Sequence, residues 1–467
     1  MSKVEEELPD GWTKVLLNQL ASHHSGDSKI IKGKLPSQPA AGLLPAYSAS
    51  GQDVWRDKFA HEGDAIIISA VGARCGKCFK ASGKWTAVAN THVVWPHPEI
   101  IDRDFLWYKI NDENFWVKGG SAQPFVKTRE SFKCELALPP LNEQQRIVDK
   151  IETLFTQLDK GEEAVREVQK LLGRYRQSVL KSAVTGQLTA DWRAARNGQL
   201  EHGRDLLARA RKNRRESWSS KSRYNEPKSP EVDELPRLPQ GWVWADLESL
   251  SAAHKHALKA GPFGSSLKKS DYSKGGYKIF GQEQVIAGDW TIGDYFIGDA
   301  KFSELENCRV APKDVLISLV GTIGKVLILP DDVVDGIINP RLVKISLNRE
   351  VYLPEFFKLY FESGFLKAIY SLDAHGATMD ILNLGIIKGL PYVLCSLEEQ
   401  REVVARVEDL FSKIDILQQQ CETELKRSAS LRQSILKDAF AGRLVPQDPD
   451  DESASELLTR IAERQDA

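Results

Sequence analysis

Two stretches of the chain repeat apolar residues at alternating intervals of four and three positions, which is typical of a helix packed along another helix. The pattern predicts one long helix over 141–190 and a second over 394–445. Between Glu143 and Ser182 the first helix spans 40 residues, or about 60 Å at about 1.5 Å per residue. We expect the two helices to pair with each other; two ordinary core helices are the alternative. The expected seam consists of Ile147, Ile151, Leu154, Leu158, Val165, Val168, Leu172, Tyr175 and Val179 in the first helix and Val403, Val407, Leu410, Ile414, Leu417, Leu431 and Ile435 in the second.

The two helices are copies of one sequence. At a constant offset of 256 positions, Leu138–Thr189 aligns with Leu394–Val445 without a gap and with 18 identities in 52 positions. The likeness is clearest between RYRQSVLKSAVTGQL and SLRQSILKDAFAGRL. Such a match indicates an internal duplication. Gly186 and Gly442 should end the two helices, because glycine readily adopts the left-handed conformation found at helix C-termini.

The segments in front of the helices also share a plan. LPDGWTKVLLNQL, near the start, resembles LPQGWVWADLESL at 238–250, and in both a Pro-x-Gly turn leads into an anchoring tryptophan. Further on, DAIIISAVGARCGK at 64–77 parallels DVLISLVGTIGK at 314–325, each an apolar strand followed by a glycine turn. Short β-branched runs between glycine turns predict mostly β domains with a few helices.

We therefore expect an α+β fold with an internal pseudo-two-fold duplication, in which two mostly β domains are separated by two long helices. A short amphipathic helix should follow each long one, since RDLLARAR resembles SELLTRIA. The expected segments are a domain over 1–140, a helix over 141–190, a linker over 191–236, a domain over 237–393, a helix over 394–445 and an acidic tail over 446–467.

The composition narrows the class of protein. A chain of 467 residues is too long for a single core. No apolar run reaches the roughly 18–20 residues of a membrane helix, and the acidic, polar N-terminus does not resemble a signal peptide. We expect a cytoplasmic protein without a membrane partner.

The six cysteines follow no framework spacing, which favours reduced thiols. Cys75 and Cys78 have the spacing of half a zinc site without a second pair, so no metal site is predicted.

The charge is uneven along the chain. The net charge of the whole chain is −2, whereas residues 192–236 carry +4 and residues 446–467 carry −5. This distribution neither requires nor excludes a nucleic-acid ligand, whose phosphates would have to be bound by local basic loops or by a basic partner.

The usual signatures of catalysis are missing from the sequence. It contains no Gly-x-x-x-x-Gly-Lys-Ser/Thr phosphate loop, no Gly-x-Gly-x-x-Gly dinucleotide turn and no Gly-x-Ser-x-Gly nucleophile elbow. An adenine methyltransferase would need an Asp/Asn-Pro-Pro-aromatic turn for the flipped base. The nearest match, Asn339-Pro340-Arg341-Leu342, lacks the second proline and the aromatic residue. The chain is therefore expected to be non-catalytic.

The repeated motifs resemble a known family. The Leu-Pro-x-Gly-Trp turn, the lead-in LPPLNEQQRIVDKIE and the helix ending RQSVLKSAVTGQLT together resemble the specificity subunit of type I restriction–modification systems. The resemblance covers both copies of the scaffold. The second lead-in departs from the first, since Cys395 and Ser396 replace Pro139 and Pro140. This difference affects one turn and leaves the helix intact.

The resemblance implies a DNA-recognition function. Each of two target-recognition domains would read one half of a split site in double-stranded DNA, and an antiparallel coiled coil would set the unread spacer. The chain would bind two methyltransferase subunits, and the larger complex would add two ATP-driven restriction subunits. No cofactor would be bound by this chain, whereas S-adenosylmethionine, ATP and Mg would be bound by partner subunits.

The candidate DNA contacts follow from side-chain chemistry alone, because recognition domains differ between members of such a family. Bases are read by paired donors and acceptors on loops that reach a groove. In the first half the candidates are Ser48, Ser50, Gln52, Arg74, Lys77, Ser121, Gln123 and Lys127. In the second half they are Gly264, Ser265, Ser266, Lys268, Lys269, Gln282, Glu283, Thr322, Lys325, Arg341 and Thr378.

Two other functions remain open at this point. A DNA-modifying enzyme with its own active site would methylate or cut DNA as the isolated chain. A scaffold that bridges proteins would show no salt-dependent binding to DNA, even with its partners present.

Overall fold

The structure is a computed structural model that describes residues 8–218, 224–231, 235–263, 266–319, 324–365 and 382–465. The chain divides into two compact units. Unit 1 combines Met1–Arg166 with Glu422–Ala467, and unit 2 is Glu167–Cys421. Each unit therefore contains the beginning of one long helix and the end of the other. Within the described ranges, no helix has the length and apolar character needed to cross a membrane.

Unit 1 contains two four-stranded sheets and several short helices. In chain order its elements are β1 (Thr13–Leu16), α1 (Leu17–Leu20), β2 (Ala21–Ser25), η1 (Lys32–Lys34), β3 (Leu44–Ser48), β4 (Gly51–Arg56), β5 (His61–Glu62), β6 (Ala65–Ser69), β7 (Cys78–Ala81), β8 (Lys84–Ala87), β9 (Thr91–Pro96), α2 (Arg103–Ile110), β10 (Lys118–Gly119), β11 (Phe125–Val126), α3 (Thr128–Ser131), β12 (Glu135–Leu138), the first part of α4 (Leu141–Val184), the last part of α13 (Leu397–Phe440) and α14 (Ala454–Gln465).

Unit 2 repeats this plan. Its elements are the last part of α4, α5 (Ala190–Ala195), α6 (Gly203–Glu216), β13 (Val243–Ala245), α7 (Leu247–Leu250), β14 (Leu258–Ala260), η3 (Lys269–Asp271), β15 (Tyr272–Ser273), β16 (Tyr277–Phe280), α8 (Gln282–Ala287), β17 (Phe296–Ile297), α9 (Asp299–Glu304), η4 (Glu306–Cys308), β18 (Val315–Ser318), β19 (Val326–Ile328), β20 (Gly336–Ile338), β21 (Leu342–Ile345), α10 (Pro354–Glu362), α12 (Leu384–Gly389), β22 (Tyr392–Leu394) and the first part of α13.

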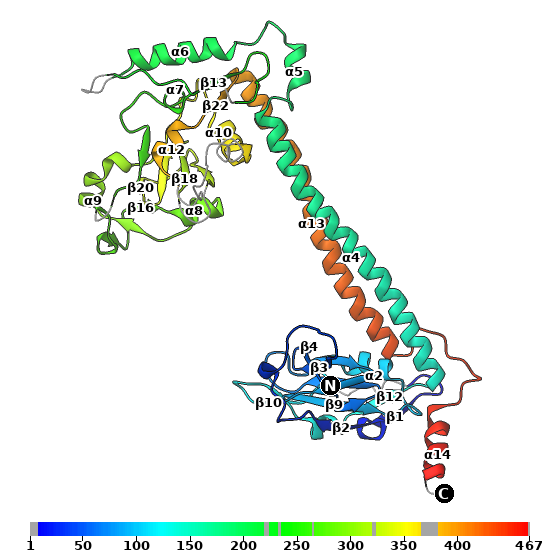
Figure 1. Ribbon diagram of the computed structural model, residues 1–467. Coiled ribbons are helices and arrows are strands. Elements are labelled where there is room, and N and C mark those ends of the chain that lie inside the picture. Colours follow the sequence, from blue (N-terminus) through cyan, green and yellow to red (C-terminus); the bar gives the residue numbers. More distant parts are fainter. Residues whose placement is uncertain are drawn as a thin grey trace, which may run out of the picture. The chain divides into compact units, whose positions relative to one another are not determined.

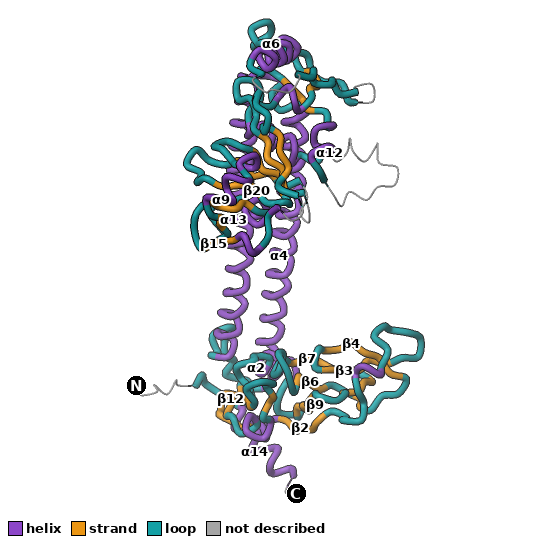
Figure 2. Tube along the Cα trace, turned by 90° about the vertical axis from the view of Figure 1, so that its left-hand side faces the viewer, coloured by secondary structure: helices purple, strands orange, loops and turns teal. Residues whose placement is uncertain are grey.

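The two units share the topology of their main sheet, and their second sheets, although different in strand order, share a parallel pair. The antiparallel sheet β2-β9-β6-β7 of unit 1, visible in Figure 2, corresponds to β14-β21-β18-β19 of unit 2. The second sheet of each unit contains one parallel pair, β3 with β8 in unit 1 and β16 with β20 in unit 2. The short ladder β1-β12 likewise corresponds to β13-β22. The predicted α+β duplication is thus confirmed, and it extends into the segments whose sequences differ.

The central strands are apolar on both faces because they separate two cores. In β6, Ile66 and Ile68 pack into the core that includes the long helices, whereas Ala65 and Ile67 pack into the core of the second sheet. Successive side chains of a strand point to opposite faces, so a strand with a core on each face needs an unbroken apolar run. The strand β18 has the same arrangement.

The long helices α4 and α13 are antiparallel, because within each unit a residue further along one chain segment contacts a residue further back in the other. Asp159 contacts Arg432 and Glu162 contacts Ser428 in unit 1, and Arg176 contacts Asp415 while Thr189 contacts Glu399 in unit 2. In unit 1, Ser428 Oγ donates a hydrogen bond to Glu162 Oε1 at 2.7 Å. In unit 2, Arg176 donates to Asp415 Oδ1 at 2.6 Å. Figure 1 shows the two helices side by side within each unit. As predicted, Gly186 and Gly442 follow the helices in the left-handed conformation, with φ of 71° and 68°.

The predicted seam matches the buried face of the helices at most positions and misses it at four. Val168, Tyr175, Leu417 and Leu431 are 44 to 50% exposed. At each of these four positions the next residue along the helix is half-buried instead, namely Gln169, Arg176, Gln418 and Arg432. A residue three positions along a helix and a residue four positions along it both lie on the same face as the first residue. The spacing pattern therefore does not show which of two adjacent residues is buried. The buried members of the seam are Ile147, Ile151, Leu172, Val179, Val403, Val407, Ile414 and Ile435, and the half-buried members are Leu154, Leu158, Val165 and Leu410.

A buried carboxylate joins each domain to the start of a long helix. In unit 1, Trp12 Nε1 donates to Glu143 Oε2 at 3.0 Å, and in unit 2, Trp242 Nε1 donates to Glu399 Oε2 at 2.9 Å. Glu143 and Glu399 are the third residues of α4 and α13, where the helix dipole favours negative charge. The Leu-Pro-x-Gly-Trp motif therefore serves as the attachment point of the long helix.

The neighbouring glutamine fixes the same junction through the backbone. Gln144 Nε2 donates to the carbonyl oxygens of Ile100 and Pro139, and its Oε1 accepts from Asp102 N at 2.8 Å. Gln400 repeats all three hydrogen bonds in unit 2, with Val351, Cys395 and Leu353. The repeated Glu-Gln pair of the sequence thus holds α2 or α10, the preceding strand and the long helix together.

The end of the other long helix, followed by a short helix, completes each junction. In unit 1, Gln447 Nε2 donates to Glu143 Oε1 at 3.2 Å, and the N–H of Ala454, which begins α14, donates to Gly11 O at 3.0 Å. In unit 2, Thr189 Oγ1 donates to Glu399 Oε1 at 2.7 Å. There the N–H of Gly203, which begins α6, donates to Gly241 O at 2.8 Å. Each domain is therefore closed by segments that are distant in sequence.

Replacing Gln144 with alanine should destabilise unit 1 by about 3 kcal/mol, because buried backbone groups of Ile100, Pro139 and Asp102 would lose their partner. Native-state hydrogen exchange of the amides in β1 and β12 would measure this loss. Gln145→Ala is the matched control, since Gln145 is exposed. Equal destabilisation by the two variants would contradict the structural role assigned to Gln144.

Three histidines of unit 1 should make its stability depend on pH. Burial lowers the pKa of the imidazoles of His23, His61 and His92, and nearby imidazoles lower the pKa further. A histidine with a lowered folded pKa contributes stability that is present above its unfolded pKa of about 6.5 and is lost as the pH falls through the folded pKa. Unit 1 should therefore lose stability as the pH falls below about 6.5.

Urea unfolding of unit 1 at pH 7.5 and at lower pH would measure this dependence. His92→Gln should reduce the loss of stability on acidification, because the unfolded chain would then take up one proton fewer relative to the folded chain. A flat profile for the wild-type protein would contradict the prediction.

Candidate nucleic-acid interface

The sheet β14-β21-β18-β19 is the main sheet of unit 2. Polar side chains from several loops lie at one of its edges. The register pairs Ser318, the last residue of β18, with Leu342, the first residue of β21, and brings the start of β19 to the same edge. The end of β14 also lies there, since Gly261 N donates to Leu342 O at 2.9 Å. The connections that contain Lys268, Lys325 and Arg341 therefore begin or end at one edge of this sheet.

Three of these residues form a connected polar group. Gln282, the first residue of α8, donates from Nε2 to Ser318 Oγ at 2.9 Å. Arg341 donates from its guanidinium to Gln282 Oε1 at 3.4 Å, and its backbone N–H donates to Asn339 Oδ1 at 2.9 Å. Arg341 is exposed while its backbone is fixed. A guanidinium held beside an amide in this way presents the donors and acceptors that suit the edge of a base pair.

Exposed charged residues lie on the segments that adjoin this group. Lys325 lies directly before β19, and its carbonyl oxygen accepts from Ser318 N at 3.2 Å. Lys268 and Lys269 are exposed at the far end of the 261–269 loop, and Glu283 is exposed on α8. Ser266 is half-buried. The candidates Gly264, Ser265, Thr322 and Thr378 lie outside the described residues.

Unit 1 has a comparable edge. Arg74 and Lys77 are exposed in the turn between β6 and β7, and Lys77 O accepts from Ser69 N at 2.9 Å. The β10–β11 hairpin lies beside this turn, because Gly72 N donates to Pro124 O at 2.8 Å. This contact brings the exposed residues Ser121 and Gln123 close to the turn. Lys127 is less available than predicted, since it forms an ion pair with Glu130 at 3.1 Å.

The turn between β3 and β4 completes this edge. A Cβ atom added to Gly51 would lie 3.0 Å from Phe79, which belongs to β7. Ser50 and Gln52 are exposed in this turn. Ser48 was predicted to contact a base, but it is 2% exposed, and its hydroxyl donates to Asp53 and accepts from Ser50 N. That prediction is corrected: Ser48 shapes the turn because both of its hydrogen bonds lie inside it.

The two cysteines of the β6–β7 turn are part of the core. Cys75 and Cys78 are each 1% exposed, and Cys78 Sγ contacts the carbonyl oxygens of Gly76 and Ile110. Burial raises the pKa of both thiols, so the thiolates that a metal ion needs are disfavoured. In the part of the chain that the structure describes, no group of three or more His, Cys, Asp or Glu side chains could hold a metal ion.

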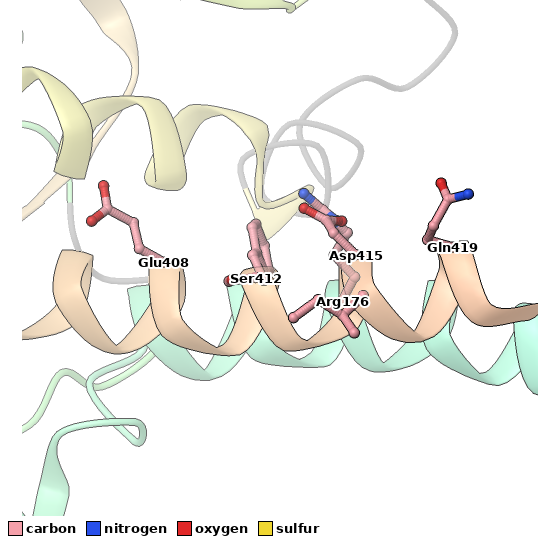
Figure 3. A pocket seen from close by; sticks show the side chains of 7 residues that line it. Arg176, Glu408, Ser412, Asp415 and Gln419 are labelled. Carbon is pink, nitrogen blue, oxygen red and sulfur yellow. The ribbon is translucent and has the colours of Figure 1, made fainter.

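A repeated arginine clamps the two long helices together. In unit 2, the Arg176 guanidinium from α4 lies 4.0 Å from the ring centroid of Phe411 and contacts Asp415 on α13, as Figure 3 shows for Arg176 and Asp415. In unit 1, Arg432 lies 5.0 Å from the ring of Phe155 and 2.6 Å from Asp159. All three members of each clamp are related by the offset of 256. The repeated arginine of the two helix endings is thereby explained, next to the positions where the seam prediction favoured Tyr175 and Leu431.

The structure also shows polar residues that the sequence analysis did not select. Ser318 joins the unit 2 group, and its counterpart Ser69 lies at the same place in unit 1, with no hydrogen-bond partner for its buried hydroxyl among the described residues. The sequence does mark both serines, because each begins a repeated Ser-x-Val-Gly at the end of a central strand. Asn339 was considered only as a methyltransferase motif, whereas its amide positions Arg341.

These observations define a class of protein. Two domains of one topology, each with exposed cationic and amide side chains at the same sheet edge, belong to a duplicated recognition protein built on paired helices. A family model described as the type I restriction modification DNA specificity domain matches residues 10–167 and 263–427. This match covers more than half of the chain, and the chain belongs to that family. It is a specificity subunit, a non-catalytic class of protein.

Individual relatives agree with this assignment. The chain is 25% identical to the Escherichia coli type I restriction enzyme EcoDI specificity subunit, over 98% of this chain and 96% of that one. It is 28% identical to the E. coli EcoBI specificity subunit, over 70% of this chain and 64% of the relative. Among solved structures, the HsdS subunit from Thermoanaerobacter tengcongensis has a TM-score of 0.55 at 18% identity, covering 95% of this chain and all of that one.

A second solved structure supports the fold over nearly the whole length. A chain from a structure described as addressing complex assembly and conformational transition of the type I R-M system has a TM-score of 0.64 at 17% identity. The match covers 94% of this chain and 99% of that chain. At these identities the likeness concerns the fold.

Proposed function

We propose that this chain reads a split site in double-stranded DNA, with the sheet edge of unit 1 on one half and that of unit 2 on the other. The observation that carries the proposal is that both units, despite different sequences, place exposed cationic and amide side chains at the same edge of the same sheet. Residues 1–140 and 237–393 would be the two target-recognition domains, and α4 with α13 would set the length of the unread spacer.

The partners and cofactors follow from the family. Two methyltransferase subunits would dock on the paired helices and would bring S-adenosylmethionine to the DNA. Two restriction subunits, with ATP and Mg, would join in the larger complex, and the assembly would work in the cytoplasm, where host DNA is found. The shared topology of the two units supports this stoichiometry, because two equivalent surfaces suit two equal partners.

Mapping of methylated adenines would test the proposed function directly. The chain would be co-expressed with the methyltransferase encoded beside it, and host DNA would be sequenced for methylation. We expect a split motif with a fixed gap that disappears when this chain is omitted. Methylation that does not depend on the chain would favour a scaffold role. Methyl transfer by the chain alone would instead favour an enzyme.

Replacing Lys268 and Lys269 with alanine together should weaken binding to all DNA sequences, because both ammonium groups are exposed on the loop that leaves the unit 2 edge at Gly261. If each neutralises one phosphate, the slope of log K against log salt should decrease by about 1.8. Binding of the complex to the mapped site and to unrelated DNA, measured over a range of salt concentrations, would give this slope.

The matched control is the double variant Lys301→Ala/Lys313→Ala, whose ammonium groups already contact Glu304 at 2.9 Å and Asp331 at 3.0 Å. It removes the same charge from unit 2 but leaves the predicted phosphate contacts in place. A similar slope change in both variants would assign the effect to net charge and would contradict a specific role for Lys268 and Lys269.

A further inference from the structure

The most exposed large apolar side chain among the described residues is Phe263, which is 83% exposed. Single apolar residues are common on protein surfaces. A phenylalanine with so little contact, however, gains almost none of the free energy of apolar burial. The next most exposed apolar side chain is Ile416, at 57%. Whether this exposure serves a function can be inferred from the residues that surround Phe263 in the fold.

The loop around Phe263 is anchored on both sides. Gly261 and Pro262 are buried, and a Cβ atom added to Gly261 would lie 1.8 Å from the carbonyl oxygen of Asn339. On the other side, Leu267 is 8% exposed and packs into the second core of unit 2. The described backbone is thus held directly before Phe263 and again at Leu267, whereas the Phe263 ring is exposed.

The anchor of this loop is also the anchor of the polar group at the sheet edge. Gly261 contacts the Asn339–Leu342 segment, which contains Arg341, and Arg341 contacts Gln282. An exposed aromatic ring is therefore attached to the same backbone segment as the candidate base-reading side chains. Side chains that read base edges enter a groove, and an apolar side chain beside them reaches the stacked faces of the bases.

We propose that Phe263 inserts between two adjacent base pairs of the half-site bound by unit 2, and partly unstacks them. This inference rests on the proposed DNA-reading function and adds to it a contact that is independent of charge and of base edges. Insertion of an apolar side chain also bends DNA and makes recognition depend on how easily the sequence deforms. Phe263 would thus favour flexible base steps at a position that no polar side chain contacts.

Unit 1 differs at the comparable edge. Its exposed phenylalanine, Phe125, is 42% exposed, and Cβ atoms added to Gly119 and Gly120 would lie 2.7 and 3.2 Å from its ring. The ring of Phe125 therefore lies against its own hairpin and is not free to enter DNA. We expect unstacking in the half-site of unit 2 and not in that of unit 1.

The test uses the full chain with its methyltransferase and a duplex that carries the mapped split motif. 2-Aminopurine would replace in turn each adenine except the methylated ones and their neighbours, because the methyltransferase flips its target base out of the stack and 2-aminopurine fluorescence increases when neighbouring bases unstack. The wild-type complex should increase the fluorescence at one step of one half-site. Phe263→Ala should abolish this increase and weaken binding about 10-fold, as expected for one lost stacking contact, with the salt slope unchanged. Phe263→Trp should restore both.

Tyr295→Ala is the control for the loss of an exposed aromatic ring, because Tyr295 is 50% exposed in unit 2 but contacts Tyr272. It should leave affinity and fluorescence unchanged. No fluorescence increase in the wild-type complex, or weaker binding by Phe263→Ala without a change in fluorescence, would overturn the insertion. A wild-type complex that does not distinguish the motif from unrelated DNA would instead overturn the proposed function itself.

Discussion

A buried hydrogen bond between a tryptophan and a glutamate holds each half of the molecule together. Glu143 and Glu399 are 1 and 2% exposed, and a carboxylate in such a place is costly unless its oxygens are paired. Trp12 or Trp242 occupies one oxygen, and the end of the opposite long helix supplies the partner of the other through Gln447 or Thr189. In unit 2, Arg193 adds an ion pair at 3.1 Å. One side chain thereby joins a domain to both long helices.

The repeats made the scaffold predictable. The long helices, their glycine ends and the two mostly β domains all follow from local spacing and from the comparison of the chain with itself. The seam could be predicted at Ile147, Ile151, Val403 and Val407, where apolar residues have no polar competitor. It was misjudged where an arginine with an aromatic and an acidic partner occupies the interface, because Arg176 and Arg432 contribute through contacts with residues far away in sequence. Apolar spacing carries no information about such contacts.

The candidate interface was predictable only in part. Loops rich in glycine, serine and basic residues indicated Arg74, Lys77 and Arg341 correctly as exposed residues. The gathering of such residues at one edge of the sheet within each unit depends on strand pairing, which a single sequence does not specify. The burial of Ser48 and the pairing of Lys127 depend on Asp53 and Glu130 in the folded chain. Phe263 carries no polar group and so could not be predicted from donor and acceptor chemistry, unlike its neighbours in the GPFGSSLKK loop.

The closure of unit 1 by α14 has a consequence for how the protein is made on the ribosome. The hydrogen bond from Ala454 N to Gly11 O joins residues from opposite ends of the chain, and Leu457 and Ile461 complete the core that contains Trp12. Unit 2, residues 167–421, has all of its sequence available before this tail is synthesised. The domain translated first is therefore the last to be completed. Until α14 has been synthesised, its unfinished apolar surface is one that nascent-chain chaperones would have to shield.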